Sequence, residues 1–183
     1  MAVTSLRGAY MYLFVIYIGG THKQSLIELH DMRFVVASSI EETYPSLRQS
    51  WWGTPASLHL DAWGVLDYAD GYNIHISTEP PKDNANKLYF VNLGGYDPQQ
   101  FTELHKNIFV VATDEQQAKQ KAVQQISEWE SPHRDHLHQI EATLELNALL
   151  ASNNHYLHLT KAPQTKSFAF TCRYVSIGKL ASS

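Results

Sequence analysis

The hydrophobic positions of this chain form patterns that are typical of buried strands. Continuous apolar runs at Leu13–Ile18 and Leu88–Leu93 are rich in β-branched and aromatic residues, as in strands covered on both faces. Each run ends in a Gly-Gly pair, which permits a tight turn. Shorter runs at Phe34–Ala37 and Phe109–Ala112 predict a second strand in each half of the chain.

A short helix is predicted between these strands in each half. The helices cover Lys23–His30 and Pro98–His105, and in the first of them Leu26 and Leu29 have the spacing of an inward face. The segment Gly19–Arg33 is just long enough for a crossover. The flanking strands are therefore expected to be parallel.

A second helix is predicted after the second strand of each half. It opens with Ser38-x-x-Glu41 in one half and Thr113-x-x-Gln116 in the other, both of which are capping-box patterns. Pro45 is expected to kink or split the first of these helices. The apolar residues of the two helices follow one face in each half: Ile40, Tyr44, Leu47 and Trp51 in the first, and Ala118, Ala122, Ile126 and Trp129 in the second.

Each half closes with segments that resemble strands. Trp63–Tyr68 and Tyr72–Ser77 flank Asp70-Gly71, a strong signal for a two-residue hairpin. Residues 140–160 have a helical pattern when taken alone, but their match to the first half favours strands. After Lys161 the apolar residues alternate as in an added edge strand: Phe168, Phe170, Cys172 and Tyr174.

The two halves repeat one pattern. Residues 13–42 align with residues 88–117 without a gap and share 11 of 30 positions, where ordinary residue usage gives roughly two. Farther along, small insertions shift the match, which pairs His59 with His136 and His75 with His158. The repeat predicts an α+β fold made by tandem duplication of a β-α-β-α-β-β unit. Two mixed sheets with helices packed on them are expected, in a pseudo-twofold arrangement.

The repeat also suggests the domain boundaries. We expect an N-terminal extension at residues 1–10, a first repeat at 11–79, a linker at 80–87, a second repeat at 88–160 and a C-terminal tail at 161–183. The apolar run that follows Arg7 resembles a secretion signal. The run recurs deep inside the chain, which favours a strand over a signal peptide. Met11 is an alternative first residue of the protein, and export is the less favoured alternative.

Several motifs of the first half are similar to one bacterial family. They are Gly19-Gly20, Glu28-Leu29-His30-Asp31 and Arg33–Ala37, followed by "SIEETYPSLRQSWWG", "LHLDAW" and "DGYNIHI". Over nearly all of residues 12–160 the chain resembles the family called domain of unknown function 1543, whose members carry one or two copies of that domain. The second half departs where "HLDAW" becomes "HLHQI". The resemblance implies two domain copies and a bacterial cytoplasmic protein, and it implies no catalytic residues.

Composition and charge exclude some classes of partner. The 183 residues are 44% hydrophobic and 11% aromatic, which is ample for a packed core. The formal net charge is −4 without a basic run, so neither a nucleic acid nor an anionic membrane is an expected partner. The single cysteine, Cys172, excludes an intrachain disulfide and fits a cytoplasmic location. Composition and charge are compatible with a protein partner or a homo-oligomer.

The most interesting group of polar residues is a set of potential zinc or iron ligands: Glu28, His30, His59 and Asp61. On the predicted helix Glu28 and His30, two residues apart, would face different directions. The other interpretation is that His30 lies at the C-terminus of the predicted helix, where the helix dipole favours a charged imidazolium. The equivalent set in the second half is Glu103, His105, His136 and His138.

Two other sites are weaker candidates. Backbone N–H groups at the predicted helix start would suit an anion, with Gly19, Gly20, His22 and Lys23 as the residues involved. The second half has Asp97 and Pro98 there, which argues against a shared anion site. The histidines of "SPHRDHLHQ" are able to bind metal or respond to pH, although a solvated loop is the commoner explanation.

No catalytic nucleophile is indicated by the sequence. The chain has neither a Gly-x-Ser-x-Gly elbow nor a Walker loop, and Cys172 has no defined basic partner. The first hypothesis for the function is a non-enzymatic binding or assembly module built from two homologous repeats. The one cofactor considered is a divalent metal. The alternative is a metal-dependent hydrolase that uses Glu28, His30, His59 and Asp61.

Overall fold

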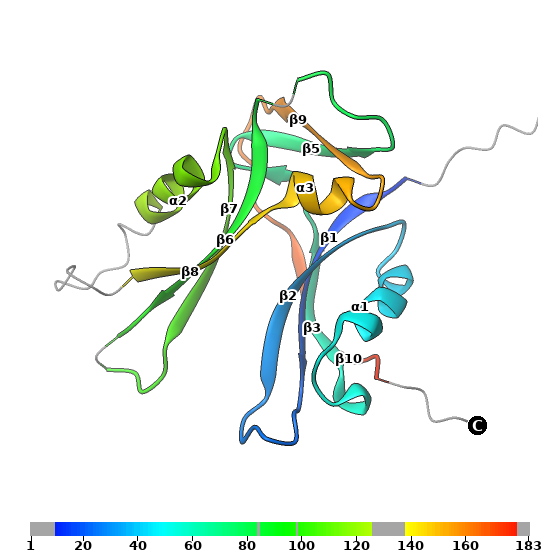
Figure 1. The fold of residues 1–183 in the computed structure, drawn as a ribbon, viewed down its shortest axis with the longest axis vertical. Helices are drawn as coiled ribbons and strands as arrows, with labels where there is room; N and C mark the ends of the chain where they lie inside the picture. Colours follow the sequence, from blue (N-terminus) through cyan, green and yellow to red (C-terminus); the bar gives the residue numbers. More distant parts are fainter. Residues whose placement is uncertain (1–9, 84, 98, 126–137, 179–183) are drawn as a thin grey trace, which may run out of the picture. The chain divides into compact units, whose positions relative to one another are not determined.

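The computed structural model describes residues 10–83, 85–97, 99–125 and 138–178 (Figure 1). The fold is α+β, with three antiparallel sheets and few helices. The chain divides into two compact units: residues 1–67 with 167–183 form unit 1, and residues 68–166 form unit 2. None of the helices within the described ranges is long and apolar enough to span a membrane.

Unit 1 is built on a four-stranded sheet in which β1 and β3 are central. The strands run in the order β10-β3-β1-β2, and every neighbouring pair is antiparallel. The strand expected in the tail is confirmed as β10 at the edge of this sheet. The bounds are β1 (Tyr12–Gly20), β2 (Leu29–Ala37), β3 (His59–Val65) and β10 (Phe170–Ser176).

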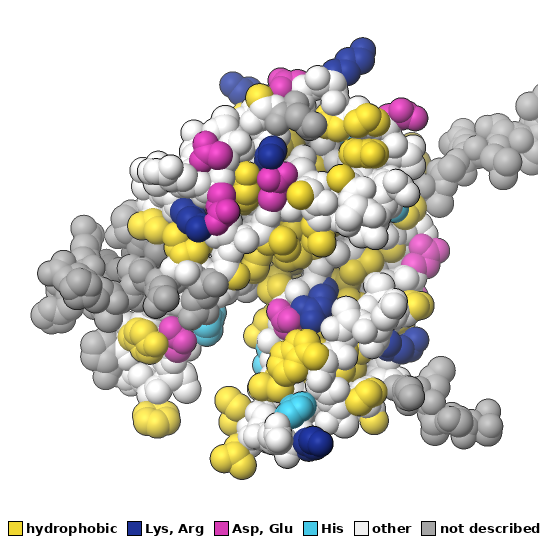
Figure 2. Space-filling view, in the orientation of Figure 1, with side chains coloured by type: hydrophobic (Ala, Val, Ile, Leu, Met, Phe, Trp, Pro, Cys, Tyr) yellow, Lys and Arg dark blue, Asp and Glu magenta, His cyan; other side chains and the backbone are white. Residues whose placement is uncertain are grey.

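The predicted crossover helix of unit 1 is wrong, because β1 and β2 form a hairpin. β1 runs to Gly20 and β2 begins at Leu29, so only residues 21–28 connect them. A parallel connection needs about a dozen residues or more, whereas an antiparallel pair needs far fewer. Leu26, expected to face inward, is fully exposed, and Figure 2 shows hydrophobic side chains at the outer end of this hairpin.

The core of unit 1 lies between one face of the sheet and α1 (Tyr44–Ser50). Leu47 and Trp51 of the predicted apolar stripe are buried, and Ile40 and Tyr44 pack against the same cluster. A 3₁₀ turn precedes α1, and Pro45 lies in the first turn of α1. The split that Pro45 predicted is therefore confirmed. The strand residues of this core are Phe14, Ile16, Ile18 and Leu60.

Unit 2 contains two three-stranded sheets, ordered β4-β5-β9 and β7-β6-β8. The hairpin predicted at Asp70-Gly71 is present, with positive φ at both residues. Leu146–Ala151 is a helix, α3, where strands were predicted. The remaining bounds are β4 (Tyr68–Ala69), β5 (Tyr72–Ser77), β6 (Lys87–Gly95), β7 (Leu104–Ala112), α2 (Glu115–Gln124), β8 (His138–Glu145) and β9 (Tyr156–Lys161).

β6 and β7 also form a hairpin, so the helix predicted at Pro98–His105 is wrong for the same reason as the first. The pairing of β6 with β7 reproduces that of β1 with β2: Gly19 lies opposite His30, and Gly94 lies opposite His105. All strand pairs that the structure describes are antiparallel, so the expected mixed sheets are corrected to antiparallel ones.

The strand that follows differs from the sequence alignment. Gly19 lies opposite His59 on β3, but Gly94 lies opposite Gln139 on β8. The register therefore matches Gln139, and not His136, with His59. His136 itself falls outside the described residues. The second half therefore has more inserted residues before this strand, relative to the first half, than the residue identities indicated.

Candidate metal centre

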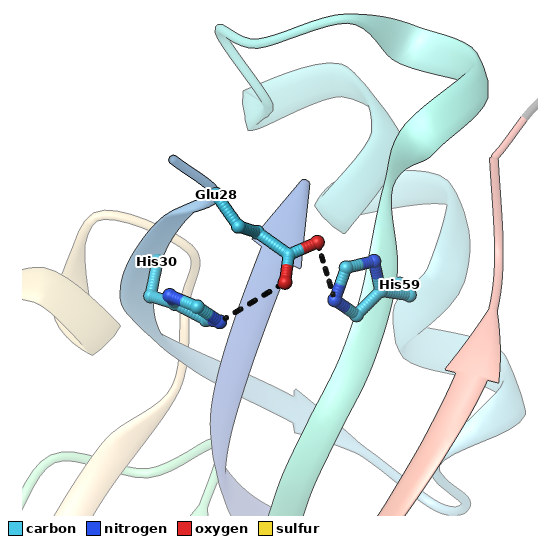
Figure 3. A group of neighbouring side chains, drawn as sticks. All are labelled: Glu28, His30 and His59. Carbon is cyan, nitrogen blue, oxygen red and sulfur yellow. Dashed lines mark ion pairs between the residues drawn. The ribbon is translucent and has the colours of Figure 1, made fainter. Parts of the chain in front are cut away.

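The four residues singled out as potential ligands come together at one end of the unit 1 sheet. His59 Nε2 lies 3.3 Å from Glu28 Oε1 and 3.4 Å from Asp61 Oδ1. His30 Nε2 lies 3.7 Å from Glu28 Oε2 and 3.4 Å from Asp61 Oδ2. Figure 3 shows the Glu28 carboxylate between the two imidazole rings. The structure thus brings together all four residues of the predicted set.

The sheet register explains this convergence. Gly19 on β1 has His30 opposite it on β2 and His59 opposite it on β3. Residues directly opposite each other project to the same face of a sheet, and so do residues two apart along extended chain. Glu28, just before β2, therefore reaches the face that His30 occupies. The objection that Glu28 and His30 diverge depended on a helix that does not form.

A β-bulge places the fourth side chain. Ile18 pairs with Leu60 and Tyr17 pairs with Ala62, so Asp61 is an extra residue between two regular pairs. A bulge redirects a side chain relative to the regular alternation of the strand. Asp61 Oδ1 reaches the ring of His59 as a result.

Gly19 supplies the space in which the four side chains meet. A Cβ built on Gly19 would lie 2.7 Å from His59 Nε2, 2.8 Å from Asp61 Oδ2 and 2.8 Å from His30 Cδ2. All three separations are too short for real Cβ contacts. Glycine at this position is therefore a requirement of the cluster.

His59 is held with one particular nitrogen facing the cluster. Its side chain is 2% exposed, and its Nδ1 lies 2.9 Å from the carbonyl oxygen of Ser57. A carbonyl only accepts, so the assignment that satisfies it puts the proton on Nδ1. Nε2 then faces Glu28 and Asp61. Both His59 Nε2 and Asp61 Oδ2 are buried and lack a hydrogen-bond partner among the described residues.

Two tyrosines flank the histidines. The ring of Tyr17 stacks on His30, with centroids 5.1 Å apart and an angle of 5° between the planes. The ring of Tyr174 on β10 lies 4.4 Å from that of His59. Burial raises the pKa of Tyr17 above its usual value, and the carboxylates of Asp61 and Asp31 raise it further. Neither tyrosine was singled out from the sequence, although Tyr17 stands two residues before Gly19 on the same face.

The second half has only part of this arrangement. His105 Nε2 lies 3.9 Å from Glu103 Oε2. His138 pairs with Gly95, one residue away from the position that corresponds to His59, and Gln139 occupies that position. His136 lies outside the described residues, so the structure places two side chains of the predicted second set together.

The predicted anion site lacks the helix on which it depended. No helix follows Gly19-Gly20; residues 21–28 form a loop, so the expected array of helix-terminal N–H groups is missing from this described segment. The Thr21 N–H donates to Ser57 Oγ at 2.8 Å, and the Gln24 N–H donates to His22 Nδ1 at 3.3 Å. The N–H groups of Thr21 and Gln24 are thus used in hydrogen bonds within the protein.

The comparisons with known proteins give a family and a fold without an activity. No curated protein matches the chain. The structure is similar to the crystal structure of a protein, Il1583, from Idiomarina loihiensis, with 34% sequence identity, a TM-score of 0.70, and coverage of 92% of this chain and 99% of that one. The model of the family described as Domain of Unknown Function (DUF1543) matches residues 25–76, a range that includes Glu28, His30, His59 and Asp61. The chain belongs to the DUF1543 family.

Proposed function

We propose that this protein binds one divalent transition-metal ion through Glu28, His30 and His59, with Asp61 beside the ion, and that zinc fits these ligands best. Imidazole nitrogen and carboxylate oxygen are both usual zinc ligands. The observation that carries the proposal is the buried Nε2 atom of His59. That atom faces two carboxylates and has no hydrogen-bond partner among the described residues.

The distances favour a shared ion over direct hydrogen bonds. Charge-assisted N–H···O bonds are about 2.7–2.9 Å long, whereas the four nitrogen–oxygen separations here are 3.3, 3.4, 3.4 and 3.7 Å. Zinc–ligand bonds of about 2.0–2.2 Å in a tetrahedron put ligand atoms roughly 3.3–3.6 Å apart. One ligand atom from each of Glu28, His30 and His59 lies within 4.8 Å of the other two, so these three side chains are close enough to share an ion.

The hydrogen bond from His59 to Ser57 supports the same proposal. Histidines that bind metal commonly donate their other N–H to a carbonyl or carboxylate, which fixes the tautomer and the ring. Nδ1 of His59 makes such a contact. A neutral His59 without an ion would direct its Nε2 lone pair at Glu28 and Asp61, an unfavourable arrangement for a side chain that is 2% exposed.

We also infer that the chain is a binding module made from two homologous repeats. The support is the shared register of the β1–β2 and β6–β7 hairpins. The antiparallel pairing of β5 with β9 sets His75 opposite His158, as a local twofold relation between equivalent strands requires. The first copy has the ligand set and the second has a reduced one, so duplication followed by loss of a site is the history proposed.

Calorimetric titration of zinc into the metal-free, untagged chain tests the metal proposal. We expect one ion per chain, and a loss of at least about 100-fold in affinity for His59→Ala and Glu28→Gln, since each removes a ligand. His75→Ala is the matched control, because His75 is an exposed strand histidine in unit 2. Absence of binding by the unmodified chain, or equal weakening by His75→Ala, would refute the proposal.

A second candidate function is metal-dependent hydrolysis, favoured by Asp61. Its Oδ2 atom is buried without a hydrogen-bond partner among the described residues. A carboxylate in that position is suited to accept a proton from a metal-bound water. Zinc-dependent release of nitrophenol from an activated ester, lost in Asp61→Asn with zinc still bound, is the expected sign of this function. Equal rates for the two proteins would exclude it.

A further inference from the structure

We infer that the ion at this centre keeps a coordination position open for a second ligand, and that this ligand has a singly charged anionic head and a planar aromatic body. The inference rests on the proposed metal binding and adds a ligand class to it. Three observations carry it: the uneven exposure of the four side chains, their summed charge, and the two flanking tyrosines.

The exposure of the cluster is one-sided. The His59 side chain is 2% exposed, whereas those of Asp61, His30 and Glu28 are 28%, 33% and 44% exposed. Structural zinc sites are closed by protein ligands, and zinc sites that act on ligands keep one position for water or substrate. Glu28, His30 and His59 offer three ligand atoms within 4.8 Å of one another, which is the number of protein ligands in the second form. This centre is sealed at His59 and solvated at Glu28 and His30. Water or a solute reaches the ion from that side.

The charge of the centre selects the head group. Glu28 and Asp61 together neutralise a divalent ion, so a singly charged ligand leaves a net charge of −1. A dianion such as hydrogen phosphate would leave −2. Like charges at short range disfavour the dianion. A hydroxamate or carboxylate head is the better match.

The tyrosines select the body of the ligand. The ring of Tyr17 lies on His30 and that of Tyr174 lies against His59, and the two residues remain 37% and 65% exposed. Exposed aromatic faces beside a polar anchor are typical of small-molecule sites, where they contact flat apolar groups. A stacked aromatic pair contributes roughly two- to tenfold in affinity. An aromatic body attached to the metal-binding head would gain this contact.

The full chain loaded with Co(II) provides the test, because visible absorption of Co(II) reports its ligands. Acetohydroxamate and benzohydroxamate share a head group and differ in the aromatic body, and inorganic phosphate supplies the dianion. We expect both hydroxamates to change the spectrum with cobalt still bound, benzohydroxamate to bind at least fivefold more tightly, and phosphate to cause no change up to millimolar concentration.

Variants test the role of the tyrosines at saturating cobalt. Tyr17→Leu and Tyr174→Leu are expected to reduce the preference for benzohydroxamate at least twofold each while leaving acetohydroxamate unchanged. Tyr17→Phe should retain the preference, and so should Tyr96→Leu, a substitution of an exposed tyrosine in unit 2.

The outcomes separate the two proposals. A chain that binds no Co(II) overturns the metal proposal and this inference together. Bound Co(II) with an unchanged spectrum, or Co(II) extracted by the hydroxamates, overturns the open position alone. Equal affinity for the two hydroxamates, or tighter binding of phosphate, overturns the ligand class while metal binding stands.

Discussion

Gly19 lies directly opposite His59 in the sheet of unit 1, and a Cβ on Gly19 would lie 2.7 Å from Nε2 of that histidine. The absence of a side chain on β1 therefore creates the space into which β2 and β3 direct theirs. A glycine in a central strand otherwise weakens a sheet, because it has no side chain to pack and loses more entropy on folding. Here it leaves room for the side chains of His30, His59 and Asp61.

Gly19→Ala is predicted to abolish the centre. The added methyl group would meet His59, Asp61 and His30 at 2.7–2.8 Å, so at least two of these side chains must move. We expect zinc affinity to fall at least about 100-fold, the upper end of the loss that removal of an outer-shell contact usually causes. Calorimetric titration measures it.

Gly71→Ala is the control for Gly19→Ala. Gly71 has a φ of +83° and nothing within 4 Å of an added Cβ, so alanine there strains only the backbone. It should cost about 1 kcal/mol of stability without changing zinc affinity. If Gly19→Ala binds zinc as the unmodified chain does, the account of this glycine fails.

Asp70 is predicted to stabilise unit 2. Its Oδ2 atom accepts hydrogen bonds from the Val111 N–H at 2.9 Å and from Lys121 Nζ at 3.1 Å. Asp70→Ala would leave the N–H of the buried Val111 without this acceptor, at a cost of about 1–3 kcal/mol in the free energy of unfolding. Urea denaturation measures the change. Asp70→Asn keeps an acceptor and tolerates the positive φ of 47°, so it should lose clearly less; an equal loss for both variants would count against this role.

The cap of α2 is predicted to make stability depend on pH. The Gln117 N–H donates to Asp114, and this bond lowers the pKa of Asp114, with a further contribution from Thr113. A carboxyl whose pKa is lower in the folded chain stabilises it fully above the unfolded-state pKa, which is about 3.9. The stabilisation is lost as the pH falls through the folded-state value.

Thermal unfolding of Asp114→Ala tests this dependence. Its midpoint should lie below that of the unmodified chain at pH 6, and the difference should shrink at pH 3. Asp114→Asn caps the helix without a charge. The difference between its unfolding midpoint and that of Asp114→Ala should therefore be nearly the same at pH 6 and at pH 3. A difference in midpoint between Asp114→Ala and the unmodified chain that is larger at pH 3 than at pH 6 would contradict the prediction.

Zinc is predicted to bind unit 1 and not unit 2. Glu103 and His105 are near each other, but Gln139 stands at the register position of His59, and an amide is not a usual zinc ligand. His105→Ala should therefore leave both the stoichiometry and the affinity unchanged. A second equivalent of zinc that disappears in His105→Ala would show that the second half also has a site.

The sequence predicted which polar residues come together better than it predicted their setting. The residue types of Glu28, His30, His59 and Asp61 were informative, because carboxylates and imidazoles are usual metal ligands. The predicted helix at Lys23–His30 was wrong because the i, i+3 spacing of Leu26 and Leu29 also occurs where a loop meets a strand. In the hairpin Leu26 is exposed, and Leu29 packs partly against the core.

Other features required coordinates. The bulge at Asp61 depends on the pairing of β1 with β3, which local propensity does not specify. Tyr174 reaches His59 because a strand more than 100 residues away along the chain pairs with β3. Pro45 and Asp70-Gly71 were predicted correctly, since proline and a positive-φ turn act within a few residues.

Anomalous diffraction at the zinc edge, from crystals of the untagged chain grown with zinc, addresses the central proposal most directly. We expect a peak within about 2.0–2.2 Å of His30 Nε2 and His59 Nε2, with a carboxylate oxygen of Glu28 as the third protein ligand. A structure of the zinc-saturated protein with no peak there, or with zinc bound only beside other residues, would contradict it.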